Sequence, residues 1–201
     1  PFRMGEYQEA RLEAIKGQAD LLYLRGIFYL AVTLDAPSPE PYETADTLGV
    51  DLGIINIATD STGEAFSGQA IEKTRQRMLN LRARMQSRGT KSAKRHLNKL
   101  SGREKRFHKN VNHVISKHIV QKAKANKQGI AIEDLRHIRK NVTVRKSQRA
   151  RHSSWSFWQL RFFLTYKAAC AGVPLRIVDP RNTSRTCSKC GHCAKENRKS
   201  Q

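Results

Sequence analysis

The first part of the chain alternates short apolar runs with turn residues, a pattern that predicts β structure. Residues 20–24 and 27–34 are two apolar runs joined by Arg25-Gly26. A two-residue connection that contains glycine is typical of a β-hairpin. Residues 6–15 are a candidate third strand. Three prolines within residues 37–41 block both helical and ladder hydrogen bonds, so this segment is predicted to be a linker.

A second β unit is predicted between residues 48 and 67. Residues 48–58 form one apolar strand pattern that contains a single acid, Asp51. Turn residues occupy 60–63, and residues 62–67 are expected to pair with the preceding strand. Short strands are also predicted at residues 129–135, which end in two acids, and at residues 173–178.

Residues 70–127 carry apolar side chains at helical spacing, as at Met78, Leu81 and Met85. Gly89 and the pair Ser101-Gly102 are candidate breaks, so we predict two or three long helices folded into a basic hairpin. The alternation of strands and helices between residues 48 and 179 predicts an α/β fold in which helices cover a mixed sheet.

A further helix, rich in aromatic residues, is predicted to end at Gly172. Its aromatic side chains fall on one face. An aromatic face of this kind packs in a core more often than it stacks on nucleic-acid bases, and we therefore assign it to the core. Five side chains share this face: Trp155, Trp158, Phe162, Tyr166 and Cys170.

The charge of the chain is large and unevenly distributed. The net charge is +21, yet residues 1–72 carry four basic and twelve acidic residues, whereas residues 73–201 carry 34 and 5. Most of the excess lies in 73–109 and 136–151. A solvated basic face is the simpler explanation of one such cluster, but two together favour binding of a polyanion, and nucleic acid is the obvious one. The candidate contacts are Arg75, Arg77, Arg82, Arg84, Lys94, Arg95, Lys105, Arg106, Arg139, Lys140, Arg145 and Lys146.

Two acids, Asp51 and Glu133, lie within or at the end of apolar strand patterns, where an isolated carboxylate is costly to bury. Taken separately, Asp51 could be a hydrogen-bonded structural acid and Glu133 could pair with Arg136. Taken together, in a strongly basic chain, they favour a magnesium site for phosphodiester cleavage. Such a site needs a third acid. Asp179 and Glu196 are the remaining candidates, and we assign neither, because one precedes a proline and the other lies in a polar tail.

Near the C-terminus, Cys187-Ser188-Lys189-Cys190-Gly191 has the spacing of one half of a zinc ribbon. A structural zinc site needs four ligands, and the eleven residues after Cys190 contain no second pair. Cys193 and His192 are too close in sequence to complete the site easily. We therefore expect Cys187 and Cys190 to form an incomplete zinc site, in a chain whose cysteine usage suits a reducing compartment.

Three segments, residues 49–53, 132–135 and 179–191, stand in the order and spacing of the OrfB/TnpB proteins of bacterial and archaeal insertion sequences. The resemblance covers roughly residues 18–200. It implies an RNase H-like (RuvC) domain at 47–180, with the helical segment 70–127 as an insertion. A β-barrel-like wedge segment at 1–46 would precede it, and a partial zinc ribbon at 181–201 would follow it.

The resemblance also implies an activity, namely cutting of DNA with a guide RNA and Mg²⁺ in the cytoplasm, near the nucleoid. It gives Asp51 and Glu133 as the first two catalytic acids, and Cys187 and Cys190 as the first pair of zinc ligands. In the family a second cysteine pair and a third acid follow, beyond Gln201. We therefore expect this chain to be catalytically incomplete. The alternative is a non-catalytic RNA- or DNA-binding remnant with a regulatory role.

Overall fold

The computed structural model describes residues 2–24, 26–35, 39–135, 157–180, 190 and 192–194. The chain divides into two compact units, Pro1–Pro39 and Glu40–Gln201. None of the helices in the described residues is long and apolar enough to cross a membrane.

The first unit is an antiparallel hairpin. Strand β1 (Ile15–Leu24) pairs with β2 (Ile27–Leu34), and Leu24 lies opposite Ile27. Gly26, between the strands, has φ +85°, a left-handed conformation that glycine adopts without steric cost. The predicted hairpin is therefore confirmed, and β1 begins earlier than expected, at Ile15.

The third strand expected from residues 6–15 is wrong. That segment contains helix α1 (Glu6–Glu9) and a 3-10 helix, η1 (Leu12–Ala14). Gly5 N donates to Gln8 Oε1 at 3.2 Å, so a side chain satisfies the start of α1. Local helical hydrogen bonds take the place of strand pairing here.

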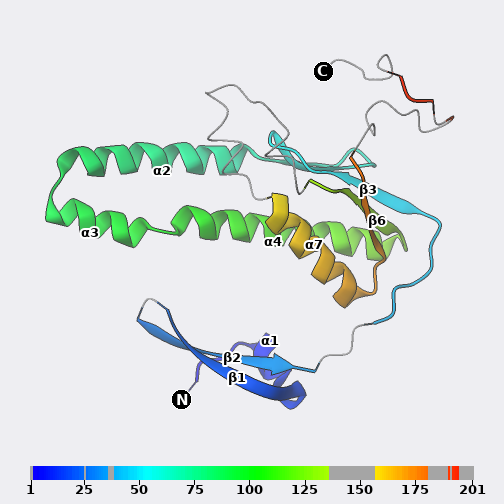
Figure 1. Ribbon diagram of the computed structural model, residues 1–201, viewed down its shortest axis with the longest axis horizontal. Coiled ribbons are helices and arrows are strands. Elements are labelled where there is room, and N and C mark those ends of the chain that lie inside the picture. Colours follow the sequence, from blue (N-terminus) through cyan, green and yellow to red (C-terminus); the bar gives the residue numbers. More distant parts are fainter. Residues whose placement is uncertain are drawn as a thin grey trace. The chain divides into compact units, whose positions relative to one another are not determined.

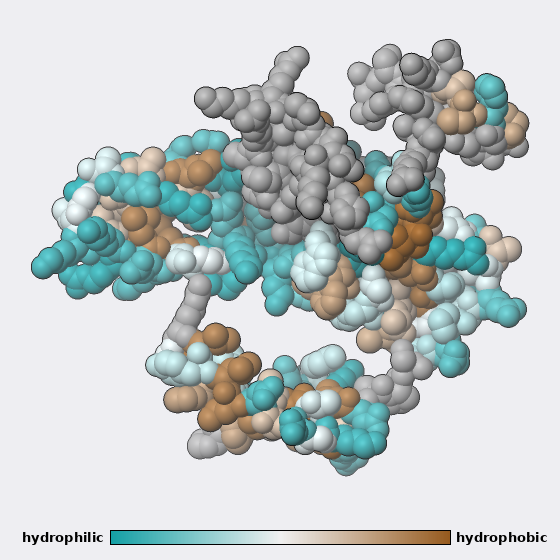
Figure 2. Space-filling view, in the orientation of Figure 1, coloured by the Kyte–Doolittle hydropathy of each residue, from teal (hydrophilic) through white to brown (hydrophobic). Residues whose placement is uncertain are grey.

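Apolar side chains of the hairpin are exposed on both of its faces. Tyr23 and its partner Phe28 on one face are 63% and 67% exposed, and Leu24 and its partner Ile27 on the other are 57% and 56% exposed. Figure 2 shows hydrophobic residues on the surface of this unit. Within its described residues, the hairpin therefore contributes nothing to the buried core.

The second unit is built on a five-stranded mixed sheet (Figure 1). The strands are β3 (Thr47–Asp51), β4 (Asn56–Asp60), β5 (Ala65–Ser67), β6 (Gly129–Glu133) and β7 (Leu175–Val178), in the order β5-β4-β3-β6-β7. Strands β3, β6 and β7 are parallel, whereas β4 is antiparallel to both β3 and β5. The predicted α/β class with a mixed sheet is confirmed.

The single strand expected over residues 48–58 is wrong, because the chain reverses between β3 and β4. Gly53 allows the reversal: a Cβ at this position would lie 2.7 Å from the carbonyl oxygen of Asn56. Leu52 and Ile57 are both buried on either side of it. The reversal is hidden in the sequence because the apolar pattern continues through it.

Three helices connect β5 to β6, as predicted: α2 (Gln69–Arg88), α3 (Lys91–Leu100) and α4 (Arg103–Ala125). The expected breaks are confirmed, since Gly89 and Gly102 have φ +63° and +75°. The Thr90 hydroxyl accepts a hydrogen bond from Ala93 N at 3.1 Å and caps α3. We call α2, α3 and the first turn of α4 the helical arm (Figure 1).

Helices α4 and α7 (Phe157–Ala171) pack side by side and supply most of the helical side of the core, to which α2 adds Ile71. Helix α7 ends at Gly172, as predicted, with φ +67°. Val173 N donates to Ala168 O at 2.9 Å and so satisfies a terminal carbonyl. The core joins both helices to the strands through Leu48, Ile57, Ile119, Ile130, Ile132, Leu160 and Leu164.

The prediction that the aromatic face of α7 packs in the core is wrong. The side of α7 that packs in the core carries Leu160, Leu164 and Ala168, which are fully buried. Trp158 and Phe162 are 70% and 50% exposed. Smaller side chains let the helix approach the sheet closely. The rings of Trp158 and Phe162 are left on the outer face, whereas Phe163 is buried. Tyr166 and Cys170 are also exposed, and Trp155 lies outside the described residues.

Candidate functional site

The two predicted carboxylates lie at the same edge of the sheet. In the parallel pairing of β3 with β6, Val50 is opposite Ile132. Asp51 and Glu133 are the next residue of each strand, so the sheet brings together two acids that are 82 positions apart in the sequence. Side chains alternate between the faces of a strand. Because Val50 and Ile132 are in the core, Asp51 and Glu133 belong to the face opposite α4 and α7.

The surroundings of Asp51 differ from those of a structural acid. Asp51 is exposed, and among the described residues its carboxylate has no hydrogen-bond or ion-pair partner. Glu133 is half-buried. The residue proposed as its partner, Arg136, lies outside the described residues.

The backbone next to Glu133 is anchored from two sides. The side chain of Asp134 accepts a hydrogen bond from Arg161 Nη1 at 2.6 Å, and both side chains are 19% exposed. Asp134 N donates to Val178 O at 2.9 Å. Sequence reasoning missed this pair because Asp134 and Arg161 are distant in the sequence. The contact holds the end of β6 against β7 and α7.

These carboxylates fit a divalent cation by donor chemistry, since Mg²⁺ prefers oxygen ligands and retains water in its shell. Among the described residues, no three acidic, histidine or cysteine side chains converge on one point. Asp179 follows β7 at the same edge of the sheet, and Glu196 lies outside the described residues. The edge therefore carries Asp51 and Glu133 on adjacent strands, and Asp179 follows the next strand along.

The cysteines predicted to bind zinc are only partly described. Cys190 is exposed and has a free thiol, as does Cys193. Cys187 lies outside the described residues. The zinc prediction therefore stays a prediction.

The predicted nucleic-acid contacts in the helical arm fall into two groups. Members of the first group are paired with a nearby acid, and members of the second group are exposed. Arg75 forms a bidentate pair with Glu72, at 2.9 Å from Nε and 2.5 Å from Nη2. Arg82 Nη2 lies 2.9 Å from Glu104 Oε2. The exposed ones are Arg77, Arg84, Lys94, Arg95, Lys105 and Arg106, and the arm is hydrophilic on the face shown in Figure 2. Arg139, Lys140, Arg145 and Lys146 lie outside the described residues.

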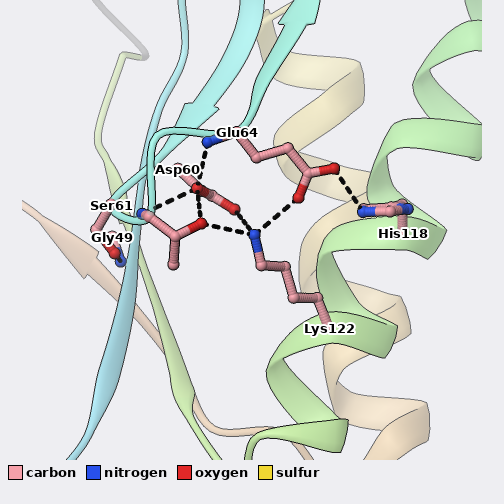
Figure 3. Close-up of polar contacts among 7 residues, drawn as sticks. Gly49, Asp60, Ser61, Glu64, His118 and Lys122 are labelled. Carbon is pink, nitrogen blue, oxygen red and sulfur yellow. Dashed lines mark hydrogen bonds and ion pairs between the residues drawn. The ribbon is translucent and has the colours of Figure 1, made fainter.

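An ion-pair network built around the buried side chain of Asp60 joins the β4–β5 turn to α4 (Figure 3). Asp60 Oδ1 accepts hydrogen bonds from Thr62 N, Thr62 Oγ1 and Glu64 N at 2.9, 2.7 and 3.0 Å. Lys122 Nζ donates to Asp60 Oδ2 at 2.5 Å and to Glu64 Oε2 at 2.7 Å. His118 Nε2 lies 2.8 Å from Glu64 Oε1. No local sequence pattern indicates this network, since its two halves are about sixty residues apart.

The network controls the ionisation of its acids. Burial raises the pKa of Asp60, but hydrogen bonds from Lys122, Thr62 and the Glu64 backbone outweigh it and hold the pKa at about 2. The hydrogen bond from Lys122 lowers the pKa of Glu64, and the two carboxylates raise the pKa of Lys122. All three groups are therefore charged at neutral pH.

We expect Asp60 to make folding sensitive to acid. Its pKa is lower in the folded state than its ordinary value of 3.8. The associated stability is present above about pH 4 and is lost as pH falls through about 2, and it amounts to about 2 kcal/mol. The check is chemical unfolding between about pH 5 and about pH 2. Asp60→Asn should lack this part of the pH dependence, and an unchanged profile would contradict the assignment.

A pocket of about 370 Å³ lies at the opposite end of the sheet, lined by residues that include Thr47, Gly129 and Arg176. Thr47 and Gly129 begin the strands that end in Asp51 and Glu133. The pocket is therefore separated from the carboxylates by the length of the parallel strands.

Comparison with known proteins gives two family matches. The family model described as "Probable transposase" (OrfB_IS605) matches residues 29–144. The model described as "Cas12f1-like, TNB domain" matches residues 157–201. Together the matches cover α2, α3, α4 and α7 and all five strands of the sheet.

Curated relatives agree with these matches. A TnpB-like protein of Methanocaldococcus jannaschii is 40% identical over 96 residues, which are 47% of this chain and 34% of that protein. The CRISPR-associated endodeoxyribonuclease Cas12f1 of Syntrophomonas palmitatica is 28% identical over 197 residues, covering 88% of this chain and 38% of the relative. The chain thus spans little more than a third of the length of either relative.

Solved structures share the fold. The cryo-EM structure of a Cas12f1-sgRNA-target DNA complex matches 84% of this chain and 36% of its own chain, with a TM-score of 0.62 and 19% identity. The cryo-EM structure of a CRISPR-Cas12f ternary complex matches with a TM-score of 0.59 and 21% identity. The likeness extends to the α/β arrangement of a mixed sheet with helices.

Proposed function

Because the chain belongs to the OrfB_IS605 transposase family, we propose that it acts in RNA-guided cleavage of DNA for a mobile element. The observation that carries this proposal is the placement of Asp51 and Glu133 at the ends of two neighbouring parallel strands, directly after the paired residues Val50 and Ile132. Relatives named as TnpB-like proteins and as CRISPR-associated endodeoxyribonucleases support the choice of substrate. Guide RNA and DNA are the partners that this function needs.

We assign residues 47–180 to an RNase H-like (RuvC) nuclease domain. Its support is the strand order β5-β4-β3-β6-β7, in which an antiparallel β-meander adjoins two parallel strands reached through helices. Residues 1–46 are proposed as a wedge-like segment, with the hairpin as its described part. Residues 181–201 are proposed as part of a zinc ribbon, in which Cys187 and Cys190 would bind the metal.

In this function Asp51 and Glu133 would hold Mg²⁺. A bound divalent ion at such a site activates water and stabilises the charge that develops on the leaving oxygen. The chain contributes the two carboxylates and their spacing. The Arg161–Asp134 pair keeps the Glu133 backbone in place, and exposed arm residues such as Arg84 and Lys94 attract the phosphate backbone.

The proposal is tested by incubating the protein with a guide RNA and a matching DNA duplex, with and without Mg²⁺. We expect these 201 residues to bind both nucleic acids but to cut poorly. A form extended by a second cysteine pair and a third acid should show Mg²⁺-dependent cleavage that requires a match between guide and target. Binding without cleavage by the extended form, under conditions in which a full-length relative cuts, would favour the non-catalytic binding function instead.

We also expect nucleic-acid binding to depend strongly on salt. The logarithm of the association constant should fall linearly with log salt, by about 0.7 for each phosphate neutralised on a single strand. Changing Arg77, Arg84, Lys94 and Arg95 together to Gln should reduce this slope by up to about three and weaken binding to all sequences alike. A salt titration measured by fluorescence anisotropy checks both expectations, and a flat response would contradict them.

A further inference from the structure

The outer face of α7 presents a row of aromatic rings to solvent. Trp158, Phe162 and Tyr166 recur every four residues and are 70%, 50% and 37% exposed. The rings of Trp158 and Phe162 are stacked, with centroids 5.4 Å apart and planes inclined by 13°. The Phe162 and Tyr166 centroids are 5.7 Å apart. An exposed apolar row of this kind marks an interaction surface.

Contacts between α7 and α4 lie directly beside this row and fix the position of the helix that carries it. Lys167 Nζ donates to the His113 carbonyl at 2.6 Å and to Ser116 Oγ at 2.8 Å. The Phe163 ring stacks on His113 with centroids 3.8 Å apart. Lys167 Nζ also lies 6.0 Å from the centroid of Tyr166. These contacts hold α7 against α4 directly beside the aromatic row.

The surroundings of the row are positively charged. Helix α7 contains no acidic residue, and the only acid of α4, Glu104, is paired with Arg82. Lys109 and Lys117 of α4 are exposed, one helical turn on either side of His113. Burial lowers the pKa of Lys167, and the charge of Lys117 lowers it further, which places Lys117 close to the seam between the helices.

We propose that Trp158, Phe162 and Tyr166, together with the flanking lysines of α4, form a stacking platform for single-stranded nucleic acid. Aromatic side chains stack on bases of any sequence, and neighbouring cations neutralise the phosphates between them. This charge complementarity selects a polyanion over a second copy of a basic chain. The inference rests on the proposed function, since it assigns a binding place for a strand that RNA-guided cleavage leaves unpaired.

The stacking platform is tested with short oligothymidylate and oligouridylate, which separate a DNA strand from an RNA strand as the preferred occupant. The sequence contains two tryptophans, so Trp155→Phe leaves Trp158 as the only one. Its fluorescence should be quenched on binding. The double variant Trp158→Leu/Phe162→Leu keeps an apolar surface but removes the rings. It should lower affinity about tenfold for each ring, with an unchanged salt slope.

Replacing the flanking lysines of α4 should change the salt dependence of binding, which the leucine changes leave unaltered. Lys109→Gln/Lys117→Gln should reduce the salt slope by about 0.7 for each phosphate that the variant no longer neutralises. Phe28→Leu is the matched control for the removal of an exposed ring, because Phe28 is 67% exposed in the other unit. It should leave oligonucleotide affinity unchanged.

Two results would overturn the platform. One is normal oligonucleotide affinity in the double leucine variant. The other is a change in sedimentation of that variant without any change in affinity, which would make this face a contact between copies. Asp51→Asn separates the platform from the proposed function, because this variant should bind oligonucleotides normally. If it also cleaves normally while the leucine variant binds weakly, the platform stands and the proposed nuclease site is wrong.

Discussion

Asp51→Asn should abolish guide-dependent DNA cleavage, with a loss of at least about 10²–10³ in rate, and leave RNA binding intact. The change keeps the size of the side chain and removes its charge. Asp51 is exposed and has no partner among the described residues, so its replacement should not disturb folding. This rate loss is the one that follows removal of a single hydrogen-bond donor from an oxyanion site. Loss of a metal ligand should slow the reaction at least as much.

The measurement is single-turnover cleavage at saturating protein, in a form of the protein that cuts. Glu133→Gln should give a loss of the same order, because the two carboxylates are proposed to share one function. Asp46→Asn is the matched control. Asp46 lies directly before the first residue of β3, at the end of the strand that is away from Asp51. Cleavage by Asp51→Asn at the parental rate would show that the reacting acids lie elsewhere.

Asp60→Ala should lower the free energy of unfolding by about 3 kcal/mol. The substitution leaves the backbone amides of Thr62 and Glu64 without their buried acceptor and deprives Lys122 of its shorter ion pair. Urea unfolding followed by circular dichroism measures the effect. Asp46→Ala should cost much less, because Asp46 is exposed.

A double-mutant cycle identifies the origin of this loss. Lys122→Met alone leaves the Asp60 carboxylate, whose side chain is fully buried, without its cation. The combined change Asp60→Ala/Lys122→Met should therefore cost less than the sum of the two single changes. Strict additivity would contradict a direct coupling between the β4–β5 turn and α4.

Local sequence patterns predicted those parts of the fold that depend on neighbouring residues. The breaks at Gly89 and Gly102 need only a residue that tolerates positive φ. The positions of Asp51 and Glu133 followed from acids that end apolar runs, and parallel pairing brought them to one edge. The prediction of strands and helices therefore sufficed to locate the candidate site.

Other parts depend on contacts that no local pattern records. The ion pair between Asp60 and Lys122 joins segments that meet only in the folded chain. The buried face of α7 was misassigned because size and hydrophobicity favour Trp158 and Phe162, whereas close packing on the sheet favours Leu160 and Leu164. Tertiary packing decided between two apolar faces of the same helix.

The helical arm leaves the sheet after β5 and returns to it through α4. Its outer part buries Met78 and Ala93, yet neither belongs to the main core cluster. Insertions or deletions of whole helical turns there would leave the strands that carry Asp51 and Glu133 undisturbed. The arm can therefore change in length and charge without displacing the strands that carry the proposed metal site.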